Sequence, residues 1–316
     1  MKSLKELRIV FMGTPEFAVA TLAALLEAGA QIVGVITAPD KPAGRGMRLS
    51  PSAVKEYALE QGLAVLQPEK LKDPAFLHQL QELKADVQIV VAFRMLPEQV
   101  WSMPPMGTIN LHGSLLPKYR GAAPINWAVI NGEKQTGVTT FKLQHAIDTG
   151  NILLQAVLPI EPADTAGSMH DKMMQLGAAL VVKSLEGLLD GSIKETPQPV
   201  LDESTAKATA APKIFTQTCK LDFDKGVEVV HNLIRGLSPF PAAFTYLDDK
   251  VLKVFEAHIE GLVQPNLHAA GQRFTDGKTY LKFSCPDGYI CLDDIQLAGK
   301  KRMKTVDFLR GYHFES

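Results

Sequence analysis

Two polar side chains, Asn110 and His112, have the types and the spacing that acyl-transfer chemistry needs. Residues 108–111 are predicted to form a strand, and side chains alternate between the two faces of a strand. Asn110 and His112 should therefore project to the same side, about 6.6–6.8 Å apart. An asparagine amide can donate a hydrogen bond to a developing oxyanion, and an imidazole can accept a proton near neutral pH. Gly113, directly after them, lets the backbone approach a ligand closely.

A histidine at the end of a strand is more commonly a packed or solvated side chain than a catalytic group. The pairing with Asn110 favours a catalytic role for His112 without establishing it. The expected position of both residues, at the carboxyl end of a strand, is where open α/β sheets bind their ligands.

Asp148, in the sequence Asp148-Thr149-Gly150, is the third candidate for chemistry. The simplest interpretation of this tripeptide is a turn in which the carboxylate accepts from the following backbone amides. Asp-Thr-Gly also occurs in aspartic proteases, but those need a second aspartate motif and a β-rich chain, and this sequence predicts neither. If Asp148 faces His112, its carboxylate would orient the imidazole and stabilise the cationic form without a metal.

The first predicted strand–helix turn, residues 12–16, suggests a nucleotide site but lacks its motif. It holds one glycine where GxGxxG has three, and Pro15 removes a backbone donor at the helix start. The sequence GxxxxGK[ST] of a phosphate-binding loop is also missing from the chain. A Rossmann dinucleotide site and a P-loop are therefore disfavoured.

The elements that must position these residues alternate between strands and helices in the first half of the chain. This alternation predicts a doubly wound α/β fold with a mostly parallel sheet. Thr14 and Pro15 are expected to open the first helix, Ser50 and Pro51 the second, and Asp73 and Pro74 the third. The predicted strands are residues 7–11, 31–37, 87–92, 108–111, 137–143 and 152–160, and the predicted helices end near residues 28 and 62, follow Pro124, and span 165–189.

The second half of the chain differs from the first in composition and in its pattern of predicted elements. Residues 191–213 are rich in Thr, Pro, Ala and Gln without periodicity, and the short strands expected at 243–247, 251–257 and 289–292 follow one helix at 226–237. We therefore predict a catalytic domain over 1–190, a linker over 191–206, and a smaller OB-like β-barrel domain over 207–316.

Composition sets limits on the class of protein. The chain has 316 residues, 46% of them hydrophobic, with 33 basic and 34 acidic side chains and a net charge of −1. A globular protein is expected, and a strongly cationic nucleic-acid coat protein is excluded, although a local basic patch is not. Three cysteines without metal-ligand spacing favour a reducing compartment. With no signal peptide or membrane-spanning stretch recognised, we expect a cytoplasmic protein.

Several motifs together carry a family resemblance. They are residues 110–117 (NLHGSLLP), 120–124 (RGAAP), 148–150 (DTG), 11–17 (FMGTPEF), 39–46 (PDKPAGRG), 211–214 (APKI) and 239–241 (PFP). This set resembles the folate-dependent formyltransferase superfamily over nearly the whole chain. The narrower resemblance is to the branch that formylates methionine on initiator tRNA.

The resemblance implies a formyl donor, 10-formyltetrahydrofolate, and an acceptor, the amine of methionine esterified to initiator tRNA. It assigns catalysis to Asn110, His112 and Asp148, with no metal, and a monomeric enzyme is expected. It assigns folate contacts to Ser114, Leu115, Leu116 and Pro117. It places the pterin against the loop 93–96 and the segment leading to Asp148; residues 92–97 are one residue shorter than the common form in the family. The residues that it implies for tRNA are Lys41, Arg45 and Arg48 in one loop and Lys300, Lys301, Arg302 and Lys304 in the second domain; a solvated turn is the alternative for the last four.

Three other functions remain open at this point. A formyltransferase for a small amine, on a nucleotide or sugar nucleotide, would use the same three residues without needing the basic loop or the second domain. A hydrolase releasing formate would replace the amine by water. A non-catalytic RNA-binding protein would leave the Asn110, His112 and Asp148 set without a purpose.

Overall fold

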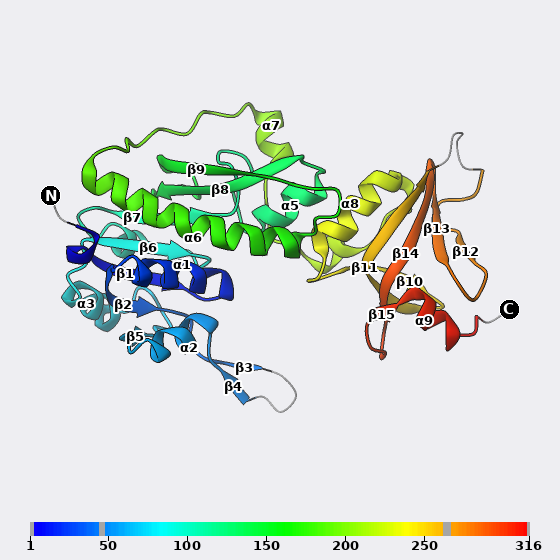
Figure 1. Ribbon diagram of the computed structural model, residues 1–316, viewed down its shortest axis with the longest axis horizontal. Coiled ribbons are helices and arrows are strands. Elements are labelled where there is room, and N and C mark those ends of the chain that lie inside the picture. Colours follow the sequence, from blue (N-terminus) through cyan, green and yellow to red (C-terminus); the bar gives the residue numbers. More distant parts are fainter. Residues whose placement is uncertain (1–2, 44–47, 262–266, 315–316) are drawn as a thin grey trace. The chain divides into compact units, whose positions relative to one another are not determined.

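The computed structural model describes residues 3–43, 48–261 and 267–314 (Figure 1). The chain forms two compact units. The first comprises Met1–Gly121, Gly137–Leu158 and His170–Ala208, and the second comprises Ala122–Thr136, Pro159–Met169 and Thr209–Ser316. The predicted domain limits at residues 190 and 207 stay a prediction.

The first unit is built on a seven-stranded sheet in the order β5-β2-β1-β6-β7-β8-β9. The pairs from β5 to β7 are parallel, and β8 is antiparallel to β7. The predicted doubly wound, mostly parallel sheet is therefore confirmed. The strands are β1 Arg8–Gly13, β2 Gln31–Ile36, β5 Val65–Leu66, β6 Val87–Val91, β7 Thr108–His112, β8 Gln135–Lys142 and β9 Ile152–Pro159.

Helices of the first unit begin where the local sequence can satisfy their free N–H groups. Asp73 caps α3 and Pro74 takes its first position, as predicted. Two predicted starts were wrong by one or two residues: Ser52, not Ser50, caps α2, and α1 begins at Glu16 with Pro15 outside it. The helices are α1 Glu16–Glu27, α2 Ala53–Glu60, α3 Pro74–Glu82, α4 Glu98–Trp101, α6 Ala166–Asp190 and α7 Glu203–Ala208, with a 3₁₀ turn at Leu4–Glu6.

The two faces of the sheet have different coverings. On one face, Val10, Met12 and Val90 pack with Phe76 and Leu80 of α3 in a common core cluster. On the other face, α6 lies so close to β7 that a Cβ at Gly177 would meet the side chain of Leu111 at 2.7 Å. Side chains two residues apart on β7 share a face, so the even-numbered residues of β7 point away from α6.

The second unit combines two packed helices with an antiparallel sheet. The sheet runs β10-β11-β14-β13-β12, with β15 paired to β14, and forms a half-barrel that agrees with the predicted OB-like domain. Helix α8 packs on β11 and β14, and α5 packs on α8. The elements are α5 Pro124–Ile130, α8 Val227–Leu237, β10 Ala243–Leu247, β11 Lys250–Gly261, β12 Arg273–Thr275, β13 Leu281–Cys285, β14 Gly288–Leu297, β15 Met303–Lys304 and α9 Thr305–Arg310, with 3₁₀ turns at Thr216–Cys219 and Phe223–Lys225.

Among the described residues, no helix is both long enough and apolar enough to cross a bilayer.

Candidate active site

His112 is the last residue of β7, and its ring is buried, with 6% of the residue exposed. Its Nε2 lies 2.8 Å from the backbone carbonyl oxygen of Tyr119. A carbonyl oxygen can only accept a hydrogen bond, so Nε2 carries a proton in this arrangement. The other ring nitrogen, Nδ1, is therefore the one that can take up or give a proton on the side away from Tyr119.

Asp148 faces that second nitrogen. Its Oδ2 lies 3.8 Å from Nδ1 of His112, and both side chains are largely buried. The same oxygen accepts a hydrogen bond of 2.9 Å from the backbone N–H of Gly121. The structure thus brings His112 and Asp148 together from two segments 36 positions apart. An imidazolium at His112 would form an ion pair with this carboxylate.

Asn110 lies on the same strand as His112, two residues before it, and so on the same sheet face. Its backbone pairs with Val90 of β6 and Phe141 of β8. It is half-buried, and within the described residues its side chain forms no hydrogen bond. The amide is therefore available as a donor on the face of the sheet opposite α6.

The segment 114–117, expected to contact folate, is held by its own polar groups. Ser114 donates to the carbonyl of Lys118, and the N–H of Leu116 donates to the hydroxyl of Thr139. Ser114 and Leu116 are buried, whereas Leu115 and Pro117 are half-buried. If this segment contacts a ligand through side chains, Leu115 and Pro117 are placed to do so, and the assignment of all four residues stays a prediction.

The loop 92–97, expected to flank the pterin, follows β6 at the carboxyl edge of the sheet. Arg94 anchors it by donating to the backbone carbonyls of Pro68 and Glu69. Burial lowers the pKa of the Arg94 guanidinium. Met95, next to it, is 74% exposed and Leu96 is buried, so the loop presents one large apolar side chain to solvent.

The basic loop expected to reach the tRNA is described in part. Lys41–Ala43 and Arg48–Ser50 form the antiparallel pair β3–β4 (Figure 1). Lys41 is exposed. Arg45 lies outside the described residues, and of Arg48 only the backbone is described. Their part in tRNA binding stays a prediction.

The basic run of the second unit divides into two kinds of residue. Arg302 makes a bidentate pair with Asp294, at 2.9 and 3.1 Å, and its guanidinium lies 4.1 Å from the centre of the Phe255 ring. Lys304 bonds Glu256 at 2.5 Å. Hydrogen bonding to these carboxylates raises the pKa of both cations.

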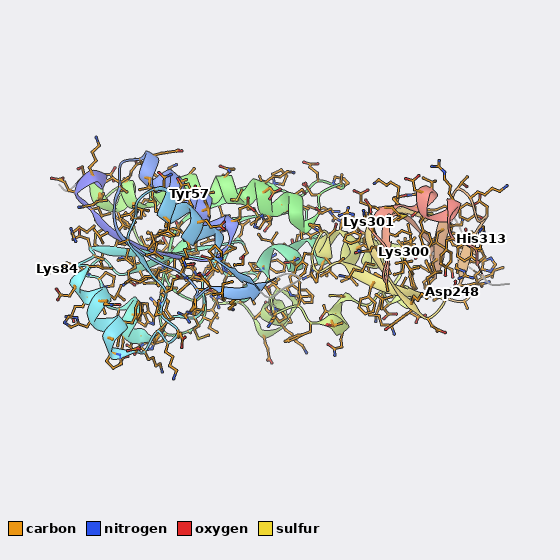
Figure 2. All side chains as sticks on the ribbon, turned by 90° about the horizontal axis from the view of Figure 1, so that it is seen from below. Tyr57, Lys84, Asp248, Lys300, Lys301 and His313 are labelled. Carbon is orange, nitrogen blue, oxygen red and sulfur yellow. The ribbon has the colours of Figure 1, made fainter. Side chains whose placement is uncertain are left out.

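Lys300 and Lys301 are also exposed, in the turn between β14 and β15 (Figure 2). Within the described part of the chain no carboxylate forms an ion pair with either of them. Of the four predicted residues, these two are the ones whose charge is free for a ligand.

Sequence reasoning did not assign the groups that orient His112 and hold the Asp148 loop. The Tyr119 carbonyl accepts from His112. The Gly121 N–H and the Gln198 side chain bond the Asp148 loop, and the Arg120 side chain in turn bonds Gln198. Arg120 and Gly121 belong to the motif 120–124, which could have drawn attention to them. Gln198 lies in the segment expected to be a linker, and nothing in its local sequence marks it.

No group of three or more His, Cys, Asp or Glu side chains that could hold a metal ion occurs among the described residues. His112 and Asp148 face one another as a pair, and a two-residue set is smaller than the three protein ligands usual for catalytic zinc.

Comparison with known families matches both halves of the chain. Residues 7–185 match the family model described as formyl transferase, and residues 213–313 match the model of the formyl transferase C-terminal domain. The chain belongs to the formyl transferase family. Within it, the chain is 52% identical over 314 residues to a methionyl-tRNA formyltransferase of Bacteroides fragilis, covering 98% of this chain and 96% of that protein. A protein of the same name from Phocaeicola vulgatus is 55% identical over 314 residues, with the same coverage.

Two solved structures share the fold of this chain. An N-formyltransferase from Helicobacter canadensis, in complex with folinic acid and dTDP-3-aminofucose, matches with a TM-score of 0.67 and 19% identity, over 94% of this chain and 100% of that one. HypX from Aquifex aeolicus, in complex with tetrahydrofolic acid, matches with a TM-score of 0.63 and 18% identity, over 98% of this chain and 48% of that one. At these identities the likeness concerns the fold alone.

Proposed function

We propose that this protein transfers a formyl group from 10-formyltetrahydrofolate to the free amino group of methionyl initiator tRNA. The observation that carries the proposal is the facing pair of His112 and Asp148 at the carboxyl end of β7, on the strand that also bears Asn110. High identity to proteins named methionyl-tRNA formyltransferase, over nearly the full length of both chains, supports tRNA rather than a small amine as the acceptor.

The chemistry joins the amine nitrogen to the formyl carbon and breaks the bond between that carbon and the folate nitrogen. A free α-amino group has a pKa of about 7.7–8.0, and esterification of the carboxyl lowers it further, so much of the amine is unprotonated at neutral pH. A modest base is enough to collect the proton that the amine loses. The main barrier is the negative charge on the formyl oxygen of the tetrahedral intermediate.

Asn110 and His112 have separate parts in this mechanism. The Asn110 amide donates to the oxyanion, because it is a neutral donor whose side chain forms no hydrogen bond with any described residue. His112 acts through Nδ1, since Nε2 is engaged by Tyr119. Asp148 stabilises the imidazolium as the proton passes from the amine towards the departing folate nitrogen.

The second unit offers a surface for the tRNA. Lys220 pairs with Phe244, Phe244 with Lys253, and Lys253 with Gln296 across neighbouring strands, so these side chains share one sheet face. Gln296 then donates to the carbonyl of Lys300. Lys220 and Lys253 therefore form a row of basic side chains that continues, through Gln296, into the turn of Lys300 and Lys301.

An exposed aromatic side chain lies beside these lysines on the same sheet face. Tyr246, on the same face of β10 as Phe244, is 49% exposed, and the Lys220 ammonium lies 5.7 Å from the centre of its ring. Lysines that contact phosphates, interleaved with an exposed aromatic ring that can stack on a base, are the features by which RNA is held. The core residues Ala243 and Leu247 point to the other face.

Replacing Lys300 and Lys301 together by alanine is expected to weaken tRNA binding. It should also reduce the slope of log K against log salt by about 0.7–0.9 for each phosphate that no longer meets a lysine. The measurement is tRNA affinity at several salt concentrations. The double variant Lys225→Ala/Lys278→Ala, which removes two exposed lysines of the same unit, is the control for net charge. Equal salt slopes in the two double variants would contradict a role for this turn in tRNA binding.

The experiment that tests the function itself incubates the protein with 10-formyltetrahydrofolate and one acceptor at a time. Methionyl initiator tRNA, a sugar-nucleotide amine, glycinamide ribonucleotide and water are the four acceptors. We expect formylmethionyl-tRNA as the product and at most a slow release of formate. Preferential formylation of either small amine, or release of formate without transfer, would contradict the proposal. The monomeric state and the cytoplasmic location remain predictions.

A further inference from the structure

We propose that Gln198 is a positioning residue that fixes Asp148 opposite His112 for the transfer reaction. The inference rests on the proposed function, and it assigns a role to a residue of the segment expected to be a linker. Gln198 would touch neither substrate, because its amide is fully engaged by the protein. It would act through the backbone that carries Asp148.

The contacts of Gln198 use its whole amide group. Its Nε2 donates to the backbone carbonyls of Asp148 and Gly150, both at 2.8 Å. Its Oε1 accepts from Nε and Nη2 of Arg120, at 3.1 and 2.5 Å. A side-chain amide is the group that offers two donors and an acceptor at this one position.

Gln198 therefore joins the two segments that hold the Asp148 carboxylate. One segment is Arg120–Gly121, whose Gly121 N–H donates to Oδ2 of Asp148. The other is the loop of Asp148 itself. Without the glutamine, the Gly121 N–H would still hold the carboxylate, but Arg120 would no longer be tied to the backbone of the loop.

The loop of Asp148 needs such an anchor. The four residues before Asp148 in this loop, 144–147, are exposed, and the contacts of His145 with Trp101 and Glu98 lie three positions before Asp148. Asp148 has a φ of 53°, in the left-handed region that non-glycine residues rarely adopt. Hydrogen bonds from Gln198 to the carbonyls on both sides of Thr149 hold the loop in this conformation.

The segment that carries Gln198 is itself fixed on β9. The backbones of Thr196 and Ile152 exchange two hydrogen bonds, of 2.8 and 2.9 Å. Glu195 bonds Lys142 at 2.6 Å. Pro197 and Pro199 flank the glutamine and restrict the chain to an extended conformation. Gln198 is half-buried between these two exposed prolines, so its side chain is directed inward.

Two variants test the role. Gln198→Met keeps the length and removes all four hydrogen bonds. Gln198→Glu keeps the acceptor for Arg120 but places a carboxylate against two carbonyl oxygens, and it serves if the methionine variant fails to fold. Val200→Ala, at a side chain that is 98% exposed two residues along the same segment, is the control. We expect either Gln198 variant to lower kcat about 10- to 100-fold with little change in KM for tRNA, because a displacement near 1 Å suffices for such a loss.

The decisive measurement is a double-mutant cycle with Asp148→Asn, in single-turnover reactions. If Gln198 acts through Asp148, Gln198→Met in the Asp148→Asn background should change the rate by less than about twofold. Hydrogen exchange over residues 143–151 should also be faster in Gln198→Met and unchanged in Val200→Ala. An equal rate loss in both backgrounds, or a wild-type rate and exchange in Gln198→Met, would overturn the inference. Neither result would contradict the proposed function, which fails only if the wild-type protein does not formylate methionyl-tRNA.

Discussion

Replacement of Asn110 or His112 by alanine is expected to lower kcat for formyl transfer by at least about 100-fold, since one oxyanion donor is worth about 2.7–4 kcal/mol and a proton-transfer group about 10²–10⁴-fold. The Asn110 amide has no other partner among the described residues, so its loss removes little from the fold. His112→Ala also removes the bond to Tyr119, which should cost about 1 kcal/mol of stability. The measurement is kcat with methionyl-tRNA alongside the melting temperature.

Gln144→Ala is the control for these variants, because Gln144 is an exposed residue in the loop that carries Asp148. It should keep the wild-type rate. Near-wild-type rates in both Asn110→Ala and His112→Ala would show that neither side chain takes part in the chemistry. Loss of folding in both, judged by the melting curve, would instead assign them a structural role.

Gly150→Ala is expected to lower both activity and stability. A Cβ at Gly150 would lie 1.6 Å from the carbonyl oxygen of Lys142 and 2.8 Å from its carbonyl carbon. Both are backbone atoms of β8, so the loop must move, and Asp148, two residues away, moves with it. A shift near 1 Å in a catalytic group can cost about 100-fold in rate. Overpacking typically costs about 1–3 kcal/mol, so the melting temperature should fall by several degrees.

Gly311→Ala is the matched control for this substitution. A Cβ at Gly311 meets nothing within 4 Å, and its φ of −117° is open to alanine. It should leave kcat and the melting temperature unchanged. A Gly150→Ala protein with wild-type kcat and melting temperature would contradict the close approach of the Asp148 loop to β8, and with it the placement of Asp148.

Much of the catalytic unit could be predicted from its sequence pattern. The alternation of apolar runs and capped helices indicated the strands and the helices between them, because burial on both faces of a parallel sheet leaves a continuous apolar run in the sequence. The expectation that Asn110 and His112 point to the same side of the sheet followed from the period of two along a strand. Helix starts were less accurate, since Ser50 and Ser52 are both good caps and the choice between them depends on where the chain can turn.

The basic run at residues 300–304 shows what pattern alone could not separate. In the sequence its four cations are equivalent. In the structure the buried Asp294 forms ion pairs with Arg302 and Lys304, whereas Lys300 and Lys301 form no ion pair with a described residue. Strand pairing between β14 and β15 decides this division, because it brings Asp294 opposite Lys304.

The amino-acid order was enough to predict the class of fold and the strand that carries Asn110 and His112. It also indicated which groups are able to do the chemistry. These depend on local period, capping and residue type. Which nitrogen of His112 faces Asp148, and what holds Asp148 in place, became visible only in the folded chain. The contacts responsible come from the carbonyl of Tyr119 and from Gln198, 50 positions beyond Asp148. Backbone carbonyls carry no signature in a sequence, and a glutamine between two prolines acquires its partners only when distant segments fold against each other.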